Sequence, residues 1–190
     1  MFLRKYLLKQ VIKQNSYFIW KNESKSIQPI KSFKPLNLDL IIGVERQKNI
    51  LLNNTRSFAE GNFTNNALLW GARGNGKSSL IKSVFHEVLS TFKTLKLIQL
   101  NKDNIFDIEF IYQLIAKFSD YRFVIFIDDL SFEKIDSDYK IIKSTLDGSI
   151  QNQPNNILLY VSSNRRHLMS RDMIDNERSS AIHTDESVEE

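Results

Sequence analysis

Residues 71–78 read Gly71-Ala72-Arg73-Gly74-Asn75-Gly76-Lys77-Ser78 and match the phosphate-binding pattern G-x-x-x-x-G-K-[ST] at every fixed position. Glycines in such a loop let backbone N–H groups turn inward around phosphate oxygens. Lys77 supplies a point charge for the terminal phosphates, and the Ser78 hydroxyl can hold Mg²⁺. The pattern predicts a site for a nucleotide, with contacts from Gly71, Ala72, Arg73, Gly74, Asn75, Gly76, Lys77, Ser78 and Ser79.

The residues on either side of this loop fit a strand that enters it and a helix that leaves it. Residues 67–70 are wholly apolar, which is typical of a buried parallel strand. After the loop, apolar residues recur at the i, i+3, i+4 spacing of a helix that runs to about Ser90. This context favours a nucleotide site over the alternative, a glycine-rich turn without a ligand.

The rest of the chain alternates between strand and helix patterns. We expect strands at 95–100, 122–127 and 157–161, and helices at 108–118 and 139–146. Apolar strands joined by helices predict an α/β fold with three layers, in which helices flank a parallel sheet and ligands bind at the carboxyl ends of the strands.

Composition excludes several classes of protein. The 190 residues suffice for one α/β domain with peripheral segments, and the net charge of +4 is too small to require a nucleic-acid partner. Disulfides and thiolate metal sites are excluded because the chain has no cysteine. Its apolar runs are too short for a transmembrane segment, and we find no secretory signal, so we expect a cytoplasmic protein.

The first 22 residues carry five basic side chains and no acid, and their apolar residues repeat at helical spacing. They predict a basic amphipathic helix. Its apolar face packs either on the main domain or on a partner chain, with binding to anionic lipid or nucleic acid as the alternative. We place residues 1–35 in this N-terminal segment and its linker, 36–168 in the nucleotide-binding core, and 169–190 in an acidic, mobile tail.

Two adjacent carboxylates follow the apolar strand that begins at Arg122. In this position Asp128 is expected to hold Mg²⁺ opposite Ser78, and Asp129 to act as the general base that polarises an attacking water. Adjacent strand residues point to opposite faces, but where a strand ends the backbone turns and both side chains can reach one site. The alternative is a solvated strand end.

The next strand delivers Asn164 to the same edge of the sheet, where its amide can contact the γ-phosphate or orient the water. A helix N-cap or turn is the competing interpretation of Asn164. Arg165 and Arg166 fit a phosphate sensor, an inter-subunit contact or a basic turn equally well. Upstream of the loop, residues 41–44, with Ile42 and Gly43 at their centre, are candidates for the adenine pocket or for an ordinary helix entry.

Three segments together resemble the AAA+ ATPase family catalogued as domain-of-unknown-function family number 815. They are the loop and its helix at 71–80, the strand end at 126–132, and residues 163–168; the segment at 43–48 also fits. The likeness covers the chain from about Tyr17 to Glu190. It implies an AAA+ core with Walker A at 71–78, Walker B at 123–129 and a sensor asparagine at Asn164.

The sequence departs from the AAA+ pattern in two respects. Asp129 stands where AAA+ proteins commonly have Glu, one methylene longer. The chain also stops before the region where the family places an Arg-Phe motif like an arginine finger and a helical lid. We therefore expect ATP hydrolysis to be slow in these residues alone.

The residues leave several functions open. An ATPase that couples Mg-ATP turnover to conformational change in a self-associating assembly, with an unknown protein partner, fits best. A small-molecule kinase lacks a recognisable lid. A nucleic-acid-acting ATPase, such as a loader or transposition helper, is supported only by the mild basicity and the N-terminal helix. A nucleotide-dependent interaction module with little turnover is the fourth class.

Overall fold

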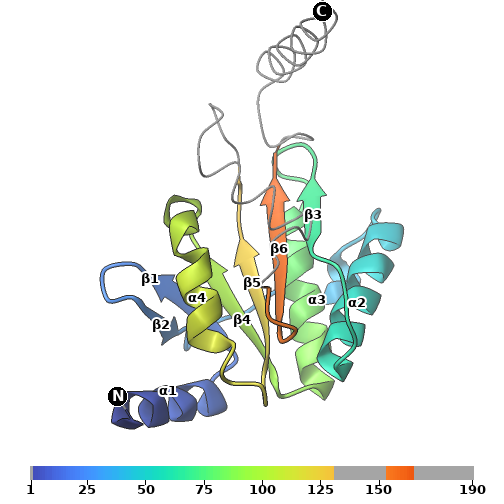
Figure 1. Cartoon of the computed structure of the whole chain (residues 1–190). Helices are drawn as coiled ribbons and strands as arrows, with labels where there is room; N and C mark the ends of the chain where they lie inside the picture. Colours follow the sequence, from blue (N-terminus) through green and yellow to red (C-terminus); the bar gives the residue numbers. More distant parts are fainter. Residues whose placement is uncertain (1, 131–152, 165–190) are drawn as a thin grey trace, which may run out of the picture.

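The computed structural model describes residues 2–130 and 153–164 (Figure 1). The predicted helix at 139–146, the pair Arg165 and Arg166, and the acidic tail at 169–190 lie outside these residues.

A six-stranded sheet forms the centre of the described structure, in the order β2-β1-β4-β5-β6-β3. Neighbouring strands run parallel, except that β2 is antiparallel to β1 at one edge. The predicted strands are confirmed, and the last extends two residues further than expected. Their bounds are β3 Ala67–Trp70, β4 Leu95–Leu100, β5 Arg122–Ile127 and β6 Ile157–Ser163.

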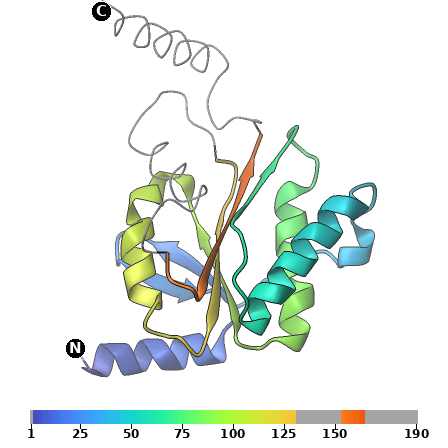
Figure 2. The same ribbon diagram turned by 45° about the vertical axis from the view of Figure 1, so that its right-hand side comes forward.

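Helices cover both faces of this sheet (Figures 1 and 2). On one face lie α2 (Glu45–Glu60) and α3 (Lys77–Thr91), and on the other α4 (Ile108–Ile115). Successive residues of the central strands pack into the two hydrophobic cores on opposite faces of the sheet, because side chains alternate along a strand. In β5, for example, Phe123, Ile125 and Ile127 pack on the α4 side, whereas Val124 and Phe126 pack on the side of α2 and α3. The three-layer α/β prediction is confirmed.

The N-terminal residues are part of this architecture. Strand β1 (Tyr17–Lys21) pairs parallel with β4, and β2 (Ser26–Pro29) returns beside it. Helix α1 (Phe2–Gln14) buries Ile12 completely, with Leu8 and Val11 packed against the same core. The N-terminal residues therefore contribute two strands to the sheet and a helix to its core, while the domain bounds at residues 35 and 168 stay a prediction.

The buried side of α1 is narrower than the sequence pattern implied. Tyr6 and Leu7, which we expected on its apolar face, are each 56% exposed. The helix contacts the core instead through residues 8, 11 and 12, which have the i, i+3, i+4 spacing of one helix face. A hydrogen bond just beyond its C-terminal end adds to this contact. There the Lys96 ammonium donates to the Asn15 carbonyl at 2.9 Å, and burial lowers the Lys96 pKa. No helix among the described residues is both long and apolar enough to cross a membrane.

Candidate nucleotide-binding site

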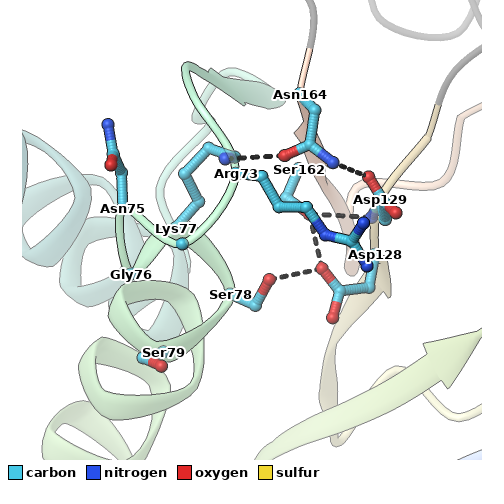
Figure 3. Close-up of a pocket in the computed structure, with 11 residues that line it drawn as sticks. Arg73, Asn75, Gly76, Lys77, Ser78, Ser79, Asp128, Asp129, Ser162 and Asn164 are labelled. Atoms are coloured by element: carbon cyan, nitrogen blue, oxygen red, sulfur yellow. Dashed lines mark hydrogen bonds between the residues drawn. The ribbon is translucent and has the colours of Figure 1, made fainter.

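Three strands deliver the predicted site residues to one edge of the sheet. The loop at 71–76 follows β3, the two carboxylates follow β5, and Asn164 follows β6. They enclose a pocket of about 320 Å³ (Figure 3), near the lower end of the 300–1,000 Å³ typical of ligand pockets. Its lining residues are Arg73, Gly74, Asn75, Gly76, Lys77, Ser78, Ser79, Asp128, Asp129, Ser162 and Asn164.

The loop conformation favours glycine at Gly74 and at Gly76. Gly74 and Gly76 have φ values of +83° and +73°, in the left-handed region that L side chains rarely adopt. A Cβ at either position would meet no atom within 4 Å, so conformation rather than crowding selects glycine. Gly76 is also the N-cap of α3, and no side chain caps this helix. The first N–H groups of α3 are therefore free of a side-chain cap and suited to an anion.

Lys77 lies between the loop and the end of β6. Its ammonium donates to the carbonyls of Gly71 at 2.9 Å and Ala72 at 2.8 Å, and to Oδ1 of Asn164 at 3.0 Å. The predicted contacts Gly71 and Ala72 thus hold the lysine and are not among the lining residues. The charge is positioned beside the glycine loop, as binding of terminal phosphates requires.

Ser78 and Asp128 meet on the other side of the pocket (Figure 3). The Ser78 hydroxyl donates to Oδ1 of Asp128, and the Ser162 hydroxyl donates to the same oxygen at 2.5 Å. A hydroxyl and a carboxylate in contact are suitable donors for Mg²⁺, which is commonly bound by one or two protein oxygens together with substrate phosphates and water. No group of three or more acidic, histidine or cysteine side chains forms a metal site within the described ranges, and such a Mg²⁺ site needs none.

Asp129 and Asn164 form the third contact of the site. Asp129 has a φ of +53°, unusual for a residue other than glycine. Asn164 donates through Nδ2 to Oδ1 of Asp129, while its Oδ1 accepts from Lys77. Asn164 therefore links the loop lysine to the second carboxylate.

The proposed adenine contacts are not among the pocket-lining residues. Ile42 is 82% exposed, and Gly43 would have no atom within 4 Å of an added Cβ. Their role at the adenine stays a prediction. Arg73 and Asn75 line the pocket as predicted, and Figure 3 shows the Arg73 side chain extending from the loop across the view of the carboxylates.

A family model described as "Protein of unknown function (DUF815)" matches residues 13–190. The chain belongs to this family. The match agrees with the resemblance drawn from the loop, the paired carboxylates and residues 163–168. No curated protein sequence is significantly similar to this DUF815 chain.

Solved structures show the same fold at low sequence identity. The C. elegans protein PCH-2 aligns with a TM-score of 0.50 and 15% sequence identity over 74% of this chain and 42% of PCH-2. The Thermotoga maritima RuvB Holliday junction branch migration motor aligns with a TM-score of 0.49 and 23% sequence identity, over 72% of this chain and 44% of RuvB. The FIGL-1 AAA domain in complex with ADP aligns with a TM-score of 0.47 and 20% sequence identity, over 75% of this chain and 53% of the FIGL-1 domain. This chain thus spans about half the length of these proteins or less, and at such low identity the likeness to PCH-2 concerns the fold alone.

Ser162 is the site residue that we did not predict. It is 1% exposed, and its hydroxyl contacts both Asp128 and the backbone N–H of Asp129. Strands β5 and β6 pair in parallel with Ile127 opposite Val161. Continuing this register by one residue sets Ser162 beside Asp128, so a correct register between the two strands would have identified it.

Proposed function

We propose that this DUF815 protein binds Mg-ATP and hydrolyses it. The observation that supports this most is the convergence of five side chains from three separate segments in one pocket: Lys77, Ser78, Asp128, Asp129 and Asn164. A glycine-rich turn without a ligand gives no reason for the two carboxylates and the asparagine to gather around it.

Each group has a distinct part in the proposed reaction. The backbone N–H groups of the loop and the start of α3 bind phosphate oxygens, and the Lys77 ammonium neutralises charge on the β- and γ-phosphates. Ser78 and Asp128 would hold Mg²⁺. When bound, the ion would offset negative charge on the phosphate oxygens.

Asp129 is the proposed general base, because its carboxylate can accept a proton from a water that attacks the γ-phosphate. Asn164 orients it: the amide nitrogen donates to the Asp129 carboxylate, while the amide oxygen accepts from Lys77. This contact lets one side chain respond both to the phosphate-binding lysine and to the base. The protein would couple turnover to conformational change in an assembly with a protein partner still to be identified.

Replacing the two carboxylates separately tests these roles. Asp129→Asn keeps an oxygen that can accept the Asn164 hydrogen bond, and asparagine tolerates positive φ better than most residues. We expect it to bind Mg-ATP about as well as the wild type and to lose turnover by roughly 10²- to 10⁴-fold, the usual contribution of a general base. Asp128→Asn is expected to weaken Mg-dependent ATP binding itself.

Calorimetric titration and steady-state phosphate release measure these two quantities. Equal losses of Mg-ATP affinity in both variants would contradict the division of roles. If both variants hydrolysed ATP as fast as wild type, the roles proposed for the two carboxylates would be wrong. If folded wild type bound Mg-ATP without measurable phosphate release, the proposed hydrolysis would be wrong, and a binding module with little intrinsic chemistry would remain.

A further inference from the structure

A buried hydroxyl lies between the two carboxylates of the site. Ser162, near the end of β6, is 1% exposed, and its Oγ is 2.5 Å from Oδ1 of Asp128 and 2.9 Å from the backbone nitrogen of Asp129. The loop pattern and the acidic pair do not include it, and it comes from a different strand (Figure 3).

The chemistry of the partners fixes the direction of both hydrogen bonds. A backbone N–H can only donate, and an ionised carboxylate can only accept. The single hydroxyl hydrogen of Ser162 must therefore point to Asp128, while its lone pair receives the N–H of Asp129. The Ser162 hydroxyl thus donates to the predicted Mg²⁺ ligand, Asp128, and accepts from the backbone of the predicted general base, Asp129.

The backbone of Ser162 holds the same turn. Its carbonyl accepts the N–H of Leu130 at 2.8 Å, next to the side-chain bond to Asp129. These contacts flank the residue with φ of +53°. A left-handed residue persists only when its surroundings hold it, and here the side chain and carbonyl of Ser162 do so.

Asp128 is oriented through a single oxygen. Its Oδ1 accepts from the hydroxyls of both Ser78 and Ser162, whereas Oδ2 has no hydrogen-bond partner within the part of the chain that the structure describes. Two donors on one oxygen leave the other free to meet a ligand.

From this arrangement we infer that Ser162 is a positioning residue, which sets the Mg²⁺-binding carboxylate of Asp128 and the turn that presents Asp129. This inference rests on the proposed function and adds a residue to its site. The hydroxyl does not touch the reacting atoms, and it acts by orienting the two carboxylates.

The test compares ATP affinity with and without Mg²⁺ in wild type, Ser162→Ala and Ser162→Thr, by calorimetry. We expect Ser162→Ala to reduce the gain in affinity due to Mg²⁺ by about tenfold or more, the usual effect of losing a residue that orients a metal ligand. Ser162→Thr keeps the hydroxyl and is expected to stay within about threefold of wild type. Ser83→Ala is the matched control, because Ser83 is also buried and its hydroxyl bonds the Leu36 carbonyl at 2.7 Å, outside the pocket.

Thermal unfolding of each variant is measured alongside. If Ser162→Ala is unfolded at the assay temperature, Ser162→Cys replaces it, since a thiol of similar size is a poor hydrogen-bond partner and should give the same loss. An unchanged Mg²⁺ effect in the alanine or cysteine variant would overturn the inference, and so would equal losses in the alanine and threonine variants. If wild type itself gains no ATP affinity from Mg²⁺, it is the proposed function that fails.

Discussion

Asp129 shows how a single backbone conformation assembles the site. In a regular strand, Asp128 and Asp129 would point to opposite faces of the sheet. The left-handed conformation at Asp129, with φ of +53°, turns the chain, and both carboxylates line one pocket. We predicted that both would reach the site, because a strand end permits such a turn. The hydroxyl that stabilises the turn depends on the pairing of β5 with β6, which local sequence does not reveal.

Tyr160 links β6 to α2 through its hydroxyl, away from the pocket. The side chain is 1% exposed, and its oxygen lies 2.8 Å from Thr55 Oγ1 and 3.0 Å from Asn54 Nδ2. Burial raises the pKa of Tyr160 to about 12, although the side-chain hydrogen bonds with Thr55 and Asn54 oppose this shift. The folded protein therefore keeps a proton between pH 10 and pH 12 that the unfolded chain releases.

Because the folded state holds this proton more tightly, the free energy of unfolding falls as pH rises from about 10 to 12. The contribution of Tyr160 is fully present below pH 10 and amounts to roughly 2–3 kcal/mol, at 1.36 kcal/mol per pKa unit. Urea unfolding at pH 9 and at pH 11.5 should show a smaller loss of stability in Tyr160→Phe than in wild type. Tyr17, whose pKa burial also raises to about 12, titrates in both proteins and cancels in the comparison. Identical losses would contradict the assignment.

At the scale of elements, α1 is predicted to be an integral part of the domain. Ile12 is fully buried in the core on the α4 side, and truncating a buried isoleucine to alanine typically costs about 2–5 kcal/mol. We expect Ile12→Ala to lower the free energy of unfolding by that amount. Leu7→Ala, on the exposed side of the same helix, should change it by less than about 0.5 kcal/mol. Urea unfolding of both variants measures the difference, and similar effects would contradict the observed packing.

The elements differ in how far sequence predicts them. Strands β3, β4, β5 and β6 are short apolar runs with turn residues at their ends, so local pattern suffices. Helix α2 is marked by its C-cap, Gly61, whose φ of +103° favours glycine. Strand β1 pairs with β4, whose residues lie about 80 positions further along the chain. The local sequence pattern carries no information about such a long-range pairing. Figure 1 shows this addition at the sheet edge away from β3.

At the scale of the molecule, the proposal predicts that turnover depends on protein concentration. Arg73 is the one arginine among the described residues that line the pocket. An arginine contributed by a neighbouring subunit raises P-loop turnover by about 10³- to 10⁵-fold. If copies of this chain associate to complete their sites, ATP hydrolysis per subunit should rise with concentration, and light scattering should show ATP-dependent oligomers. Rapid hydrolysis per subunit that is independent of concentration would show instead that the groups of one chain suffice.

The central claim is that the glycine loop and Lys77 bind ATP, and calorimetric titration of wild type and Lys77→Ala with Mg-ATP tests it most directly. Loss of the ammonium removes charge-assisted contacts to phosphate worth about 2–3 kcal/mol, so affinity should fall roughly 30- to 150-fold. Lys93→Ala, which removes an exposed lysine beyond the end of α3, is the control and should bind like wild type. Saturable wild-type binding with the expected loss in Lys77→Ala supports the account, whereas no binding by folded wild type, or equal affinity in wild type and Lys77→Ala, would contradict it.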